Sequence, residues 1–196
     1  MEKINFIKTF IPQGDFKEKY EHGGMMVRHL AAVLDEKMGA YECYECTVPI
    51  GEYDEGEIQK AFAEFSVKMD ALKLKQAKVD KIAEIAVYDT SSSVNGFVLN
   101  GLLVWLDKAT RVGLMNSTTI AKASGQETTT LWLGGMKLVV DCDKAIQLLS
   151  ALEMYALECF NVTASHKQAV SELKTIEEVE AYDYKAGYPK MLEMSV

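Results

Sequence analysis

Basic residues are too scarce in this 196-residue chain to suit a nucleic-acid partner. Aspartate and glutamate outnumber lysine and arginine by 29 to 21, which leaves a formal net charge of −8. Because binding to nucleic acid requires clustered cations that displace counterions from phosphates, the composition argues against nucleic acid as a partner. We expect the negative charge to serve mainly solubility.

Long apolar runs are missing as well. The stretch from Met1 to Ile11 is interrupted by charges and has no apolar core, so it is unlike a signal peptide. No later stretch is long enough to cross a bilayer. We therefore expect a soluble chain that is made in a cytoplasm, is not secreted by a signal peptide and has no membrane partner.

Histidine is scarce, with only three residues in the chain. His22 and His29 are separated by Gly23-Gly24, which argues against a shared helical face. His166 falls in the late part of a long helical pattern, and the sequence shows no partner that would orient it as a general base. We interpret His166 as a solvated helix residue.

Cysteine is also scarce, and two of the four cysteines have the spacing of a zinc knuckle. Cys43 and Cys46 lie in a segment, Met38 to Pro49, that is rich in Tyr, Cys, Thr and Val and is typical of a strand. Residues three apart in a strand point to opposite faces and do not share a metal ion. We interpret the cysteines as buried, reduced thiols, with zinc as the alternative, and predict no metal or cofactor.

Motifs that mark active sites are missing too. The Ser and Thr clusters contain no Gly-x-Ser-x-Gly elbow. Gly134-Gly135 lies between two strand-like runs instead of before a helix, which favours a hairpin turn over a phosphate loop. Asp141 and Asp143 are followed at once by apolar sequence, unlike a calcium-binding loop. We predict no catalytic residue and a protein that is not an enzyme; a small hydrolase is the remaining enzymatic alternative.

A pattern that occurs twice between residues 94 and 166 is the main positive feature of the sequence. Each copy, 94–107 and 129–141, consists of two β-prone runs around a two-residue turn, and an aspartate and a helical pattern follow. The turns are Asn100-Gly101 and Gly134-Gly135, whose residues adopt a positive φ at low energetic cost. The pattern predicts two antiparallel hairpins, the first with Phe97 and Leu99 paired to Val104 and Leu106.

Helices are predicted on either side of these hairpins. From Glu55 to Tyr88 the apolar residues recur mostly at spacings of three and four, which is typical of one long amphipathic helix. Asp107 is the expected N-cap of a helix over 108–123, and Asp141 or Asp143 that of a long helix reaching Val170. Thr175 to Glu178 has the spacing of a capping box. In the helix 108–123 the apolar side is expected to hold four residues: Ala109, Val112, Met115 and Ile120.

These elements predict an α+β fold in which long amphipathic helices pack on two short antiparallel β-hairpins. We expect three parts. Residues 1–55 form an N-terminal segment with short strands and a helix around Met26 to Lys37, and residues 56–88 form a long connecting helix. Residues 89–196 form a hairpin-helix-hairpin-helix domain, with a further edge strand expected at Met191 to Val196.

Trp105 and Trp132 are the candidate protein-contact residues. Strict alternation places Trp105 on the face opposite Val104 and Leu106, and Trp132 likewise opposite its two leucine neighbours. If both side chains are exposed, they are suited to anchor a partner protein. The alternative is that helices cover both faces of each hairpin, which would make the tryptophans core residues.

Several segments together carry a resemblance to a known family. They are the helix that leads into Ala86–Val94, the hairpin Phe97–Asp107, the helix start Lys108–Leu114 and the triplet Leu131-Trp-Leu133. From about residue 75 to residue 188 the chain resembles a bacteriophage tail-associated family, domain of unknown function 4376, found in phage and prophage tail-fibre and neighbouring genes. The amino-acid sequence of these segments is most similar to members of the family from gut Bacteroidales and their phages.

The resemblance implies a phage or prophage structural or accessory protein that binds other tail or fibre proteins, and possible assembly with itself through the long helices. Its place would be the virion or the cytoplasm of the bacterial host. The family has no established catalytic motif, so no catalytic residue carries over. A phage-encoded inhibitor or regulator that binds a host protein is the alternative.

Overall fold

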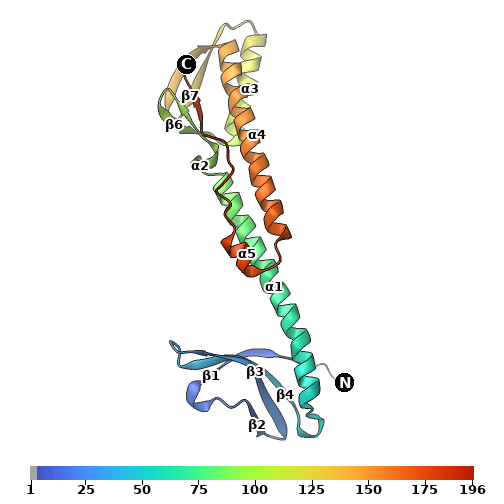
Figure 1. Cartoon of the computed structure of the whole chain (residues 1–196). Coiled ribbons are helices and arrows are strands. Elements are labelled where there is room, and N and C mark those ends of the chain that lie inside the picture. Colours follow the sequence, from blue (N-terminus) through green and yellow to red (C-terminus); the bar gives the residue numbers. More distant parts are fainter. Residues whose placement is uncertain (1–3) are drawn as a thin grey trace. The chain divides into compact units, whose positions relative to one another are not determined.

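The computed structural model describes residues 4–196, and these fall into two compact units that meet in sequence at Lys73 and Leu74 (Figure 1). The fold is mixed α+β with mainly antiparallel strand pairing, which confirms the predicted α+β class. The long predicted helix is present as α1 (Glu55–Asp89) and contributes residues to both units. Its end at Asp89 precedes the polar segment that begins at Thr90.

The first unit is built on a four-stranded antiparallel sheet with the strand order β1-β4-β3-β2. Its strands are β1 (Ile7–Pro12), β2 (Lys19–His22), β3 (Met25–Asp35) and β4 (Ala40–Pro49), and short 3-10 turns occupy Gln13–Asp15 and Ile50–Glu52. Leu30 and Cys46 on one face pack with Ile58 of α1 to form a small buried cluster. The strand predicted over Met38 to Pro49 is confirmed as β4.

The helix predicted around Met26 to Lys37 is wrong, because that segment forms strand β3. Buried residues occur on both faces of β3, and such a strand has the same continuous apolar sequence as a buried helix. A bulge between Leu30 and Val33 adds to the ambiguity by breaking the alternation. Ala31, within the bulge, has a positive φ of 51°.

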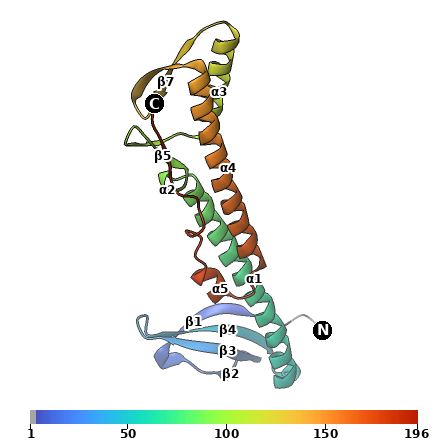
Figure 2. The same ribbon diagram turned by 45° about the horizontal axis from the view of Figure 1, so that its top comes forward.

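The second unit contains two ribbons of strands on one side of a helical pair (Figures 1 and 2). Its elements after α1 are α2 (Ser92–Asn95), β5 (Gly96–Leu99), β6 (Leu102–Trp105), α3 (Lys108–Ala123), β7 (Thr128–Leu133), β8 (Met136–Asp141), α4 (Cys142–Glu172), α5 (Ile176–Ala181) and β9 (Leu192–Met194). Strands β6, β5 and β9 form one sheet in that order, which we call the first ribbon. Strands β7 and β8 form another, which we call the second ribbon. The edge strand expected near the C-terminus is confirmed as β9, which pairs with β5 in parallel.

The ends of these helices follow the predicted capping residues. The Asp107 carboxylate accepts a hydrogen bond from the Thr110 amide at 2.9 Å and begins α3. Asp141, the first of the two candidates, caps α4 by accepting from the amides of Asp143 and Lys144. Thr175 begins α5 with a complete capping box. Each cap satisfies amides that the first turn of a helix leaves unpaired.

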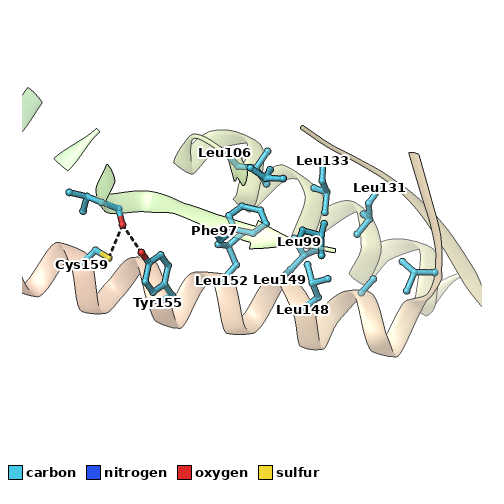
Figure 3. Packing of buried hydrophobic residues seen from close by; sticks show 14 residues of the cluster. Phe97, Leu99, Leu106, Leu131, Leu133, Leu148, Leu149, Leu152, Tyr155 and Cys159 are labelled. Atoms are coloured by element: carbon cyan, nitrogen blue, oxygen red, sulfur yellow. Dashed lines mark hydrogen bonds between the residues drawn. The ribbon is translucent and has the colours of Figure 1, made fainter. Parts of the chain in front are cut away.

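The core of the second unit forms where the inner faces of both ribbons meet α4 (Figure 3). Phe97 and Leu99 of β5 and Leu131 and Leu133 of β7 are almost completely buried. Residues from one side of α4 complete the cluster: Leu148, Leu149, Leu152, Tyr155 and Cys159. Since each ribbon has only two or three strands, this contact supplies the burial that such ribbons require for stability.

The Val94 carbonyl joins α4 to the start of the first ribbon. It accepts hydrogen bonds from the Tyr155 hydroxyl at 2.8 Å and from the Cys159 thiol at 3.2 Å (Figure 3).

The pairing of β5 with β6 differs from the expected register at one end. Leu99 pairs with Leu102, whereas Leu106 follows the strand, although it is buried as expected.

Replacement of Phe97 by alanine is expected to destabilise the second unit by about 3–5 kcal/mol, because it leaves a cavity where a fully buried side chain was. Phe160→Ala, at a side chain of α4 that is 60% exposed, is the control and is expected to change stability by less than about 0.5 kcal/mol. Urea unfolding followed by tryptophan fluorescence tests this, since both tryptophans lie in the second unit. Equal losses in the two variants would contradict the packing described.

Glu55 is expected to make the first unit sensitive to acid. Hydrogen bonds from the Tyr53 hydroxyl, the Gln59 amide and the Arg28 guanidinium lower the pKa of Glu55 from 4.5 to about 2. The stabilisation is therefore complete above the unfolded pKa of about 4.5 and is lost as the pH falls through the folded value. Glu55→Gln should consequently lower the melting temperature at neutral pH and have little effect near pH 2.

The control for this experiment is Glu57→Gln, which removes the same charge from the same helical turn but none of these hydrogen bonds. Thermal melts of the full chain by circular dichroism, recorded across the acid range, provide the measurement. A Glu55→Gln effect that does not shrink with falling pH would show that the carboxylate is not stabilised in the folded chain.

Candidate protein-contact surface

Trp105 and Trp132 both lie on the outer faces of their ribbons. Trp105 is 42% exposed and Trp132 is 61% exposed, whereas the residues on either side of each are buried. The predicted alternation is thus confirmed, and the alternative that both tryptophans are core residues is wrong. The reason is that the buried cluster of the unit takes up only the inner face of each ribbon.

The first ribbon ends in an apolar edge strand, which we call the β6 edge: Leu102, Leu103 and Trp105. Strand β6 is the outermost strand of its sheet, and Leu103 is 60% exposed. Its sequence contains neither a charged residue nor a proline. Natural edge strands usually carry such residues to prevent pairing with other chains. The two leucines were not identified from the sequence, although the absence of charge from residues 102 to 105 was a usable signal.

The second ribbon presents a similar outer face and lies close to the first. Trp132 of β7 is paired with Lys137 of β8, and the exposed Val139 lies nearby on β8. A Cβ atom added to Gly134, in the turn of this ribbon, would come within 3.1 Å of the Val104 side chain. The turn of the second ribbon therefore contacts β6.

Arg111 of α3 connects the end of β6 to α4. Its side chain is buried, donates to Glu153 at 2.9 Å and donates to the Leu106 carbonyl at 2.8 Å. The predicted apolar side of α3 is largely wrong, since Ala109, Val112 and Ile120 are exposed and only Met115 packs against the core. The buried guanidinium of Arg111 finds the acceptors that it requires on α4 and at the Leu106 carbonyl.

Exposed apolar side chains also occur on α4 near this ion pair. Leu157 lies one helical turn after Glu153, and Met154 and Phe160 are exposed as well. The Arg111–Glu153 pair is internally neutral, so it adds no net charge to the surrounding surface. The surface around the end of β6 thus combines large apolar side chains with a compensated ion pair.

His29 and His166 are both held by hydrogen bonds to neighbouring segments. His166 is partly buried, not solvated as predicted, because its Nε2 donates to the Ala186 carbonyl at 2.9 Å and its Nδ1 accepts from the Tyr182 hydroxyl at 2.8 Å. A carbonyl only accepts, which assigns the proton to Nε2. His29 is buried and likewise has both ring nitrogens engaged, by the Lys17 carbonyl and Glu45. Both side chains hold neighbouring segments in place.

All four cysteines are buried and none forms a disulfide, as the interpretation of reduced thiols requires. Cys46 packs in the cluster with Leu30 and Ile58, and burial raises the pKa of its thiol to about 11. Burial also raises the pKa of Cys159. Within residues 4–196 no three His, Cys, Asp or Glu side chains are grouped so that they could hold a metal ion.

The second unit has two open grooves on its surface. One, of about 500 Å³, lies between α4 and β9 and includes Leu148 and Met194. The other, of about 610 Å³, is lined by Tyr88 and Tyr184 with acidic neighbours at its rim. Serine and charged residues line both grooves, Ser195 with Lys144 in the first and Ser91 and Ser93 with Glu84 in the second. In the described part of the chain, no helix is both long enough and apolar enough to cross a membrane.

Comparison with known proteins identifies the class to which this mixed α+β fold belongs. Residues 76–186 match the family described as Domain of unknown function (DUF4376). The match covers more than half of the chain, so the chain belongs to this family. The matched residues fall entirely within the second unit, which contains both ribbons. No curated protein and no solved structure matched the chain.

The buried thiols are expected to resist alkylation in the folded chain. With a pKa of about 11, only about 0.1% of Cys46 is thiolate at pH 8, and burial further limits access. A cysteine introduced at the exposed Thr119 serves as the reference, and we expect it to react with iodoacetamide at least about 100-fold faster than the native thiols. Mass spectrometry of labelled peptides gives the rates.

The same labelling separates the two interpretations of Cys43 and Cys46. Urea should make all four native thiols reactive, whereas a zinc chelator should have no effect on the folded chain. Faster labelling of this pair after treatment with a chelator would contradict the interpretation of free buried thiols and support the zinc alternative.

Proposed function

We propose that this chain is a non-enzymatic protein-binding module that acts as a structural or accessory component of a phage or prophage tail or tail fibre. The observation that carries the proposal is the β6 edge, together with Trp132 on the neighbouring ribbon. Large apolar side chains are exposed there in spite of a strong overall negative charge. Exposed apolar patches rimmed by polar residues are typical of protein interaction sites.

The chemistry of these residues suits a contact surface. Trp132 and Trp105 are large, rigid side chains of the type that dominates binding energy at protein interfaces. Removing apolar surface from water contributes roughly 25 cal/mol per Å², so even a small number of buried anchors provides several kcal/mol. The Arg111–Glu153 pair is already formed within the chain, so a partner does not have to supply a compensating charge.

The placement in a phage tail is supported by the resemblance of residues 75–188 to a tail-associated family, and membership of the family DUF4376 is consistent with it. The partners would be other tail or fibre proteins, and self-assembly through the long helices is a further expectation. A phage-encoded inhibitor of a host protein is the second candidate, since it would use the same exposed surface. In either case the chain works by binding and not by catalysis.

A particle-incorporation experiment tests the proposed function. A phage that lacks the gene is complemented with the wild-type chain or with the double variant Trp105→Ala and Trp132→Ala, and the chain in purified particles is quantified by mass spectrometry. We expect the wild-type chain in many copies per particle and at least a tenfold reduction for the variant, because hot-spot truncation commonly costs about 2 kcal/mol or more. Phe10→Ala, at an exposed aromatic residue of the first unit, is the control.

The second candidate predicts a different result. A chain that is absent from particles, and that instead co-purifies from infected cells with a single host protein, would contradict the tail assignment and favour the inhibitor. Loss of that host complex in the double variant, but not in Phe10→Ala, would then assign it to the same surface.

A further inference from the structure

The outer side of strand β6 has main-chain groups without a partner strand. Leu99 and Leu102 flank a two-residue turn in which Asn100 and Gly101 have φ values of 51° and 81°, typical of a type I′ hairpin. Such a flanking pair is hydrogen-bonded, and hydrogen-bonded and non-hydrogen-bonded pairs then alternate along the ribbon. Leu103 and Trp105 consequently direct their N–H and C=O groups away from β5, towards the free edge.

Only another strand can form regular hydrogen bonds with these outward N–H and C=O groups. The chain protects a comparable edge elsewhere, since β1, at the edge of the first sheet, carries Lys8 and ends at Pro12. Strand β6 has neither device. The occupant of the β6 edge is therefore expected to be an extended segment.

We propose that this segment is β6 of a second copy of the chain, paired antiparallel about a two-fold axis that passes midway between the two copies of Val104. The inference rests on the proposed use of this surface in protein contacts and names one partner for it. A two-fold axis perpendicular to the sheet keeps outward residues outward. In this register Leu103 of each copy lies opposite Trp105 of the other, and each such pair exchanges both main-chain hydrogen bonds.

Side-chain complementarity favours a second copy over an unrelated strand. The two Leu103–Trp105 pairs are aliphatic–aromatic contacts on one face, which are among the favourable cross-strand pairs. Because the chain has a net charge of −8, most of its acidic surface would repel an identical copy. A two-fold contact at β6 brings no charged strand residue against its equivalent, since residues 102 to 105 contain none.

Light scattering coupled to size exclusion, over a dilution series of the full chain, tests the inference. The wild-type chain is expected at twice its single-chain mass of 21.8 kDa at the higher concentrations. Leu103→Pro removes an outward N–H without removing a bond to β5, and Leu103→Lys places a charge on the edge. Each variant is expected to raise the dissociation constant at least tenfold. Val139→Lys, which adds the same charge to the exposed face of β8, is the matched control and should not change it.

The proposed pairing of Leu103 with Trp105 of the other copy is tested separately by cross-linking. Leu103→Cys and Trp105→Cys chains, mixed and treated with a short bis-maleimide, are expected to cross-link to each other more than either does to itself. Circular dichroism and urea unfolding confirm that each variant is folded. A wild-type chain that stays monomeric throughout, or a dimer that persists in both folded Leu103 variants, would overturn the inference. Normal incorporation of such a chain into particles would leave the proposed function standing, so the two failures are distinguishable.

Discussion

Burial of the inner faces of two short ribbons against α4 is the constraint on which the second unit depends. Phe97 and Leu131 are almost fully enclosed there, and alternation along each strand leaves no freedom in what lies on the opposite side. A shift of one residue in either ribbon would expose this core, so the outward positions of Trp105 and Trp132 follow from the same packing. One strand register therefore determines both which side chains form the core and which form the contact surface.

The elements with local signals could be predicted from the sequence. The Asn100-Gly101 turn, the Asp107 cap and the Thr175 capping box act through neighbouring residues, and all occur where expected. The predictions that failed depend on distant partners. Strand β3 becomes a strand because it is covered on both faces, and His166 becomes partly buried because Tyr182 and the Ala186 carbonyl reach it from the C-terminal segment.

In the candidate surface, too, the features that depend on neighbouring residues were predictable and those that depend on distant elements were not. Alternation alone placed both tryptophans on outer faces, and it did so correctly. It did not decide whether helices cover those faces, since that depends on how α3 and α4 are arranged. The exposure of Val112 likewise depends on tertiary packing, since the inward side of α3 carries Arg111, Leu114, Met115 and Thr118. Two of these four residues are polar, which the apolar pattern of the helix did not indicate.

The parallel pairing of β9 with β5 has a consequence for synthesis on the ribosome. Residues 97–99 bond with residues 192–194, so the sheet joins segments separated by almost half of the chain. Contacts of such long sequence separation form late. During translation the central strand β5 therefore stays open on one side until residues 192–194 of β9 have emerged. On polysomes, neighbouring nascent chains carry this second unpaired edge side by side, which makes the period before β9 emerges the time of greatest risk for mispairing between copies.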